Sequence, residues 1–478
     1  MFLKYSRRYS FVTCGLLLAV VAGCSGSDLP DSFKARFVYS DRTEGLMREA
    51  QDGVKEHPGV KELLDERFGD PQHLLAWSQL PIEFGGVSCK VTQVPDGEKI
   101  KDLYLEIDGE LVIEEDQTVI AQFVTGNAAP AVVEISKWRS EEGKANLKGN
   151  LEVPPAVGDV LIIGAGERLQ SGRALYMQHC SHCHGTSGDG DGPTAEYLYP
   201  RPRDYRHGVF KFTSTKPQSK VSRDDLTRVL RNGVAGTYMP SFVPMLDEAQ
   251  LEDVVEYVRF LSMRGEFERK LAGELSADYS KDAVESRKAD GESYKDIVAE
   301  LTDFLAEDMV DSLEFVSDDL ANSWTEADTE DALIIPGSAR VPDSPESRRM
   351  GRELYLSKAI NCADCHGIAG YGNGPQTTIY EKNPVTQELY SEPGLHDVWD
   401  NINQPRNLTY GIYRGGRRPI DLYRRIYAGI KGSRMPSFKN LTDEQIWHIV
   451  NYVLSIPFEP EPGHEPLPGS DVATASNN

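Results

Sequence analysis

Two segments of the chain carry cysteines and a histidine at a spacing that suits covalent attachment of a cofactor. Both follow the pattern Cys-x-x-Cys-His, at Cys180-Ser-His-Cys183-His184 and at Cys362-Ala-Asp-Cys365-His366. Two thiols three positions apart reach the two vinyl groups of one porphyrin and form thioethers, and the next residue directs its imidazole at the iron. A chance match is expected in roughly 0.002 of chains of this composition. The two segments therefore predict two covalently bound haem c groups.

Three other uses of these cysteines explain the pattern less well. A structural zinc site needs four ligands, and the two cysteine pairs lie 182 residues apart. A thioredoxin-like dithiol needs a βαβ setting and has no use for the histidine. A disulfide outside the cytoplasm also leaves the histidines unexplained. We therefore interpret both segments as haem attachment sites.

Each haem iron needs a sixth ligand, and one methionine occupies the same place after each attachment motif. Met239 and Met435 each begin the tetrapeptide Met-Pro-Ser-Phe. A thioether opposite an imidazole raises the reduction potential and leaves no open coordination site, which suits electron transfer. Met245 and Met263 compete for this role in the first copy but have no counterpart in the second. The predicted iron ligands are His184, Met239, His366 and Met435.

The attachment motifs belong to a longer internal repeat. Gly172-Arg-Ala-Leu-Tyr176 recurs as Gly351-Arg-Glu-Leu-Tyr355, and the Met loops follow in the same order. The second copy has extra residues between Pro375 and Pro405. The predicted organisation is a signal peptide (1–23), an N-terminal α+β region (24–165), a first haem domain (168–264), an acidic helical spacer (265–345), a second haem domain (346–458) and a disordered tail (459–478).

The elements that position the haem residues are predicted to be helices. Apolar residues at helical spacing precede each motif and recur at 248–262 and 443–455, where they close each copy. Residues 87–163 are predicted to form strands, because apolar and polar residues alternate there. Cys89, in this region, is expected to be a buried free thiol. The predicted fold is mainly α: two all-α haem domains, an N-terminal α+β region with a small antiparallel sheet, and a helical spacer.

The net charge of the chain and its N-terminal residues indicate which partners it can bind and where it is located. The 478-residue chain has a formal net charge of −24, which argues against nucleic acid, because phosphate binding needs a basic surface. Basic residues precede an apolar run at 11–23 that is too short to span a bilayer as a helix, as in an export signal. The run ends Val-Ala-Gly-Cys24, which resembles a bacterial lipoprotein box. We expect Cys24 to carry the lipid that anchors the protein at a membrane, facing the periplasm.

Both copies resemble class I cytochrome c domains, over about 210 residues. The shared features are an N-terminal helix with a glycine, the attachment motif, a Met loop and a C-terminal helix with an aromatic residue. The resemblance implies that Gly172 and Gly351 allow each N-terminal helix to cross the C-terminal helix closely, beside Tyr257 or Tyr452. It also implies that Cys180 and Cys183 bind one haem and that Cys362 and Cys365 bind the other.

This resemblance predicts a dihaem cytochrome that transfers single electrons in a respiratory chain. Its expected partners are a quinol-oxidising complex, a terminal oxidase or another cytochrome, and it would be a carrier or a subunit of one complex. The alternative is a peroxidase-like dihaem enzyme with one open haem site, against which the two equivalent Met loops argue. A third hypothesis is that residues 32–165 recruit a partner. Arg203 and Arg406, at equivalent positions, are either partners of haem propionates or surface residues.

Overall fold

The computed structural model describes residues 37–39, 60–95, 101–107, 113, 118–124, 131–148, 154–304, 309–384 and 386–459. The predicted signal peptide, Cys24 and all of the predicted tail except residue 459 lie outside these residues. In the part of the chain that is described, no helix combines the length and the apolar character needed to cross a membrane.

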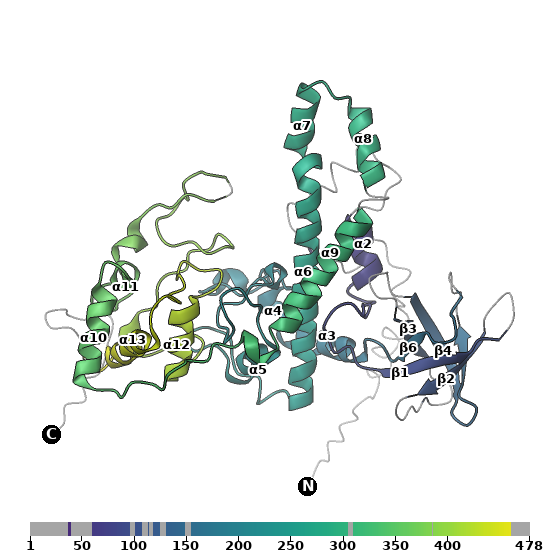
Figure 1. Cartoon of the computed structure of the whole chain (residues 1–478), viewed down its shortest axis with the longest axis horizontal. Coiled ribbons are helices and arrows are strands. Elements are labelled where there is room, and N and C mark those ends of the chain that lie inside the picture. Colours follow the sequence, from purple (N-terminus) through teal and green to yellow (C-terminus); the bar gives the residue numbers. More distant parts are fainter. Residues whose placement is uncertain are drawn as a thin grey trace, which may run out of the picture.

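The N-terminal region contains a closed barrel of six described antiparallel strands (Figure 1). Neighbouring strands follow the order β1-β2-β5-β4-β3-β6, and β6 pairs with β1 to close the barrel. Alternate side chains point inward, so that Leu103, Leu105, Ala121 and Phe123 are buried. The strands are β1 (Val87–Gln93), β2 (Asp102–Ile107), β3 (Val119–Phe123), β4 (Ala131–Arg139), β5 (Lys144–Lys148) and β6 (Val160–Ile163).

The predicted small antiparallel sheet is therefore wrong, although the strands themselves were predicted. Alternation of apolar and polar residues identifies a strand and its buried face, but it does not say which strands pair. The short strand β6 pairs with β1 on one side and with β3 on the other, and this double pairing removes both sheet edges. The prediction for Cys89 is confirmed: its side chain is 2% exposed, and burial raises the pKa of its thiol to about 11.

The first haem domain is built from four helices. Helix α3 crosses α6, and α5 also packs against α6. Two of these helices begin at a capping side chain: Ser222 caps α5, and Asp247 forms a capping box with Gln250 at the start of α6. The helices are α3 (Glu167–His179), α4 (Ser181–His184), α5 (Arg223–Asn232) and α6 (Glu248–Tyr279).

Helix α6 continues well past residue 264, so the predicted domain boundary falls inside one helix. In Figure 1, α7 extends the column of α6, and α8 returns beside it. Helix α9 packs back on α6 through buried residues that include Leu320 and Trp324. The segment after α9 then pairs with the first haem domain at Thr215 and Leu333 before it enters the second. These helices are α7 (Lys281–Ala289), α8 (Tyr294–Asp303) and α9 (Met309–Glu326).

The second haem domain repeats the plan of the first. Helix α10 crosses α13, and α12 packs against α13. A separate apolar core holds these helices together, and it includes Tyr355, Ile446, Val450 and Tyr452. The helices are α10 (Pro345–Leu356), α11 (Cys362–His366), α12 (Pro419–Ala428) and α13 (Asp443–Ser455).

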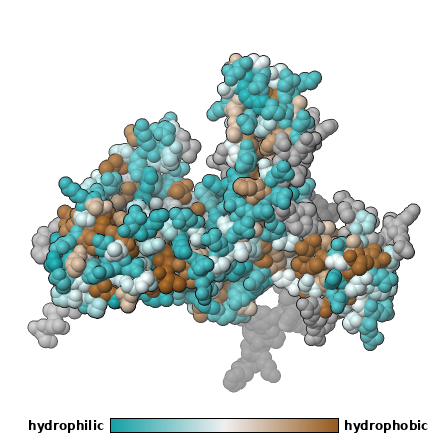
Figure 2. Space-filling model, viewed as in Figure 1, coloured by the Kyte–Doolittle hydropathy of each residue, from teal (hydrophilic) through white to brown (hydrophobic). Residues whose placement is uncertain are grey.

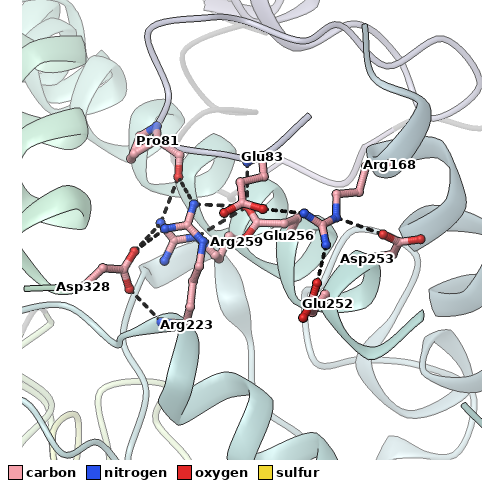
Figure 3. A network of polar contacts seen from close by, with 9 residues as sticks. All are labelled: Pro81, Glu83, Arg168, Arg223, Glu252, Asp253, Glu256, Arg259 and Asp328. Carbon is pink, nitrogen blue, oxygen red and sulfur yellow. Dashed lines mark hydrogen bonds and ion pairs between the residues drawn. The ribbon is translucent and has the colours of Figure 1, made fainter. Parts of the chain in front are cut away.

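A polar network joins the barrel, the first haem domain and the spacer (Figure 3). At its centre Arg259 of α6 is fully buried, donates to the carbonyl oxygen of Pro81 at 2.9 Å and lies 3.2 Å from Asp328. Arg223 donates to the same carbonyl at 2.8 Å and to Glu256 at 2.6 Å. Breaking a buried ion pair by removing one partner costs about 3–5 kcal/mol. The network therefore fixes the segment that leads into β1 against α6.

Apolar side chains also lie on the outside of the barrel, where brown surface is visible in Figure 2. Ile120 of β3, Val132 of β4 and Val160 of β6 are 54%, 40% and 38% exposed. The pairing of these strands places the three residues on neighbouring strands of the barrel. Clustered exposed apolar residues are typical of interaction surfaces.

Candidate functional site

Close helix crossings support both attachment motifs. A Cβ atom at Gly172 would lie 2.7 Å from the carbonyl carbon of Asp253 in α6. A Cβ atom at Gly351 would lie 2.6 Å from the carbonyl carbon of His448 in α13 and 2.8 Å from Cβ of Tyr452. Only glycine fits at either crossing, because carbon atoms in contact are about 3.5–4.0 Å apart. The packing role expected for these glycines is confirmed.

A tyrosine on each crossing helix holds the end of the attachment motif. The hydroxyl of Tyr176 donates to the carbonyl oxygen of Gly185 at 2.8 Å, and that of Tyr355 donates to Gly367 at 2.7 Å. Both tyrosine rings are buried. Each ring also meets the aromatic residue of the C-terminal helix edge-on, with centroids 5.2 Å apart in the first domain and 5.3 Å apart in the second. The residue after each histidine is thus tied to the helix pair.

The two histidines are oriented in the same way. Nδ1 of His184 lies 3.0 Å from the carbonyl oxygen of Arg203, and Nδ1 of His366 lies 3.1 Å from that of Arg406. A proton on Nδ1 satisfies the carbonyl and leaves the lone pair of Nε2 for a metal. Burial lowers the pKa of His184 to about 4 and also lowers that of His366. Both imidazoles are therefore neutral at physiological pH, as an iron ligand must be.

The two Met loops have the same backbone arrangement. The carbonyl oxygen of Met239 accepts from the amide of Val234 at 3.0 Å, and that of Met435 accepts from Ile430 at 3.1 Å. Both methionine side chains are partly buried against the core of their domain. Of the two competitors, Met263 is fully buried inside α6, and Met245 is 50% exposed.

All of the predicted haem residues line one continuous cavity of about 880 Å³ between the two domains. Its volume is at the upper end of the range of about 300–1,000 Å³ that is common for cofactor pockets. Apolar residues such as Leu226, Phe242 and Ile426 form much of its wall, which suits the faces of a porphyrin. The predicted residues that it brings together are Cys180, Cys183, His184, Met239, Cys362, Cys365, His366 and Met435. The donor set and the apolar walls fit haem.

Side-chain contacts near the cavity dock the two haem domains. Lys211 forms a buried ion pair with Asp397 at 2.8 Å, and Lys431 donates to Oγ1 of Thr215 at 2.9 Å. The guanidinium of Arg203 lies 3.6 Å from the ring centroid of Trp399. Asp397 and Trp399 belong to the extra residues of the second copy. Sequence reasoning noticed that insertion but assigned it no role, and a tryptophan within it was the available signal.

Comparison with known families agrees with this geometry. Residues 167–258 match the family described as cytochrome c oxidase, cbb3-type, subunit III, and residues 349–457 match the family described as cytochrome c. The chain is a c-type cytochrome with two tandem cytochrome c domains. This cytochrome therefore binds two haems covalently, and its two cytochrome c domains support haem electron transfer. c-type cytochromes are typically exported proteins.

Two further comparisons give no additional evidence on the fold or the function. No curated protein is similar enough to this cytochrome to be matched to it. A solved chain of the reducing HAO-like protein complex of Kuenenia stuttgartiensis is 22% identical, with a TM-score of 0.41. The alignment covers 60% of this cytochrome and 96% of that chain. At this level of similarity neither the fold nor the function is inferred from it.

Proposed function

We propose that this cytochrome passes single electrons from one haem to the other inside the chain, and thereby connects two redox partners. The observation that carries the proposal is the single cavity lined by both sets of haem residues. The iron of each haem supplies the one-electron couple. The protein would supply the cysteines for thioether attachment, His184 and Met239 as ligands for one iron, His366 and Met435 as ligands for the other, and a fixed relation between the two sites.

The docking contacts support a fixed relation over a flexible one. The side chains of Lys211 and Asp397 are 10% and 6% exposed, and an ion pair buried to this degree depends on both partners. Lys431 of the second Met loop is held by Thr215 and by the carbonyl oxygen of Ser219, both in the first domain. The second Met loop is therefore held against the first haem domain.

The setting that we propose is a respiratory chain outside the cytoplasm. Lipidation at Cys24 would hold the protein at a bacterial membrane, facing the periplasm. Its partners would be a quinol-oxidising complex, a terminal oxidase or another cytochrome. The apolar outer face of the barrel at Ile120, Val132 and Val160 supports a role for the N-terminal region in binding a protein partner.

The first test is the visible spectrum of the matured protein, oxidised and reduced, with and without carbon monoxide, alongside the haem-to-protein ratio. We expect two low-spin haems per chain that do not bind carbon monoxide. One haem that binds carbon monoxide in the unmodified protein would show that Met239 or Met435 is not a firm ligand. The peroxidase-like alternative would then be favoured over simple electron transfer.

The second test measures electron transfer between the haems after rapid partial reduction. We expect equilibration whose rate is independent of protein concentration. Asp397→Lys places a second positive charge beside Lys211, so it should slow equilibration by separating the domains. The charge-swapped double variant Lys211→Asp with Asp397→Lys restores opposite charges and should recover much of the rate. A rate that depends on protein concentration in the unmodified chain would refute the proposal.

A further inference from the structure

One side chain of the second haem domain lies against a residue that lines the haem cavity of the first. Trp399 belongs to the insertion between residues 375 and 405, and its ring covers the guanidinium of Arg203 at 3.6 Å. Arg203 lines the haem cavity and follows Pro202 in the loop whose carbonyl orients His184. The stack therefore joins an insertion of one domain to the haem-binding loop of the other.

Both members of the stack have unused hydrogen-bond donors. Nε1 of Trp399 is buried and has no hydrogen-bond partner among the described residues. The guanidinium of Arg203 is half-buried, lines the haem cavity and has no ion-pair partner within 4.0 Å among the described residues. A buried donor without a partner costs about 1–3 kcal/mol, and more when it is charged. Such groups are retained where a ligand satisfies them.

The chemistry of these donors selects the missing partner. A planar cation stacked on an indole that carries an N–H donor suits a carboxylate, which can accept charge-assisted hydrogen bonds from the guanidinium and a hydrogen bond from the indole. The carboxylates that a haem brings to this cavity are its two propionates. The carboxylate of Asp397 is already engaged, since it accepts from Lys211 at 2.8 Å and from the backbone amide of Trp399 at 3.1 Å.

We propose that Trp399 of the second domain, together with Arg203, binds a propionate of the haem in the first domain. The first haem site is then complete only when the two domains are docked. This inference rests on the proposed haem residues of the first domain and adds a positioning residue from outside that domain.

The surroundings of Trp399 hold its ring in place. A Cβ atom at Gly432, in the second Met loop, would lie 2.6 Å from Cζ3 of the indole, so the backbone packs directly on the ring. The amide of Val398 donates to the carbonyl oxygen of Gly432 at 3.1 Å. The same Met loop that supplies Met435 thus fixes the side chain that reaches the first haem.

The test is the pair of midpoint potentials in Trp399→Phe, measured by redox titration of the matured dihaem protein. Phenylalanine keeps an aromatic ring over Arg203 but removes the N–H donor. A propionate that loses a donor retains more negative charge, which favours ferric iron. We expect the equilibrium constant for reduction of the first haem to fall three- to tenfold, which is roughly 30–60 mV at 59 mV per tenfold change. The potential of the second haem should not change.

Two variants make the result interpretable. Trp447→Phe removes an indole whose Nε1 donates to the carbonyl oxygen of Ser338, and it should leave both potentials unchanged. Met239→Leu identifies which of the two potentials belongs to the first haem. Unchanged potentials in Trp399→Phe, or equal shifts of both haems, would overturn the inference while leaving the dihaem function intact. Fewer than two haems in the unmodified protein would instead contradict the proposed function.

Discussion

Replacement of Gly351 by alanine tests the helix crossing on which the second haem site depends. The added Cβ would lie 2.6 Å from the carbonyl carbon of His448, 2.8 Å from Cβ of Tyr452, and closer still to the carbonyl oxygen of His448. Since contacting carbon atoms need about 3.5 Å or more, α10 and α13 must move apart by about 1 Å. The obstructing atoms are mainly backbone, so no side-chain rotation relieves the overlap.

Overpacking of this kind costs typically about 1–3 kcal/mol, and a backbone obstruction places Gly351→Ala near the upper end. For a domain of about 100 residues, 3 kcal/mol corresponds to a fall in Tm of roughly 12 °C or more. The assay is thermal unfolding of the matured protein, followed by far-ultraviolet circular dichroism and by haem absorbance. We expect the second haem domain to unfold at a lower temperature while the first is little affected.

Gly273→Ala is the matched control, because it makes the same substitution inside a helix that offers space. No heavy atom lies within 4 Å of the Cβ position at Gly273 in α6. Alanine is more stable than glycine in a helix interior by roughly 0.5–1 kcal/mol, so this variant should be slightly stabilised. An unchanged Tm in Gly351→Ala, or an equal loss in Gly273→Ala, would refute the argument from close approach.

Three other predictions concern buried polar groups. Tyr355→Phe removes one of the two donors to the carbonyl of Gly367, the other being the amide of Gly370, and should cost about 1 kcal/mol, measured as a fall in the denaturant midpoint while haem content is retained. Asp328→Asn weakens the ion pair with the fully buried Arg259 and should destabilise the junction of barrel and α6 by about 3 kcal/mol, seen as faster proteolysis near Pro81. Burial lowers the pKa of Lys431 from 10.5 to about 8, so the unfolded chain binds more protons between these values. The stability of the unmodified protein relative to Lys431→Met should therefore rise with pH between about 8 and 10.5, and a flat difference in denaturant midpoints would contradict this.

The haem residues could be proposed from the sequence because their chemistry depends on local spacing. The Cys-x-x-Cys-His motif is read from five consecutive residues, and the internal repeat predicts Met239 and Met435 by their position. Gly172 and Gly351 were recognised through the family resemblance, and the tight crossings confirm their role. The tandem cytochrome c domains are confirmed by two family matches.

Long-range pairing was not accessible in the same way. The alternating residues of β2 and β3 predicted strands, but closure of the barrel depends on β6 pairing with both β1 and β3, and no local pattern encodes that choice. The docking of Trp399 on Arg203 joins residues that are far apart in the chain. Both features result from tertiary packing, which single-sequence patterns do not specify.

Because α6 is one continuous helix, a movement at one of its ends is transmitted to the other. Its first half crosses α3 beside the first haem site, and its second half carries the column of α7 and the return of α8 (Figure 1). The buried ion pairs of Arg259 lie between these two parts of the helix and resist tilting of α6. A protein partner that bound the far end of the column, at α7 and α8, would therefore orient the first haem domain as well as tether it. The polar network that joins α6 to the barrel would oppose the force exerted by this partner.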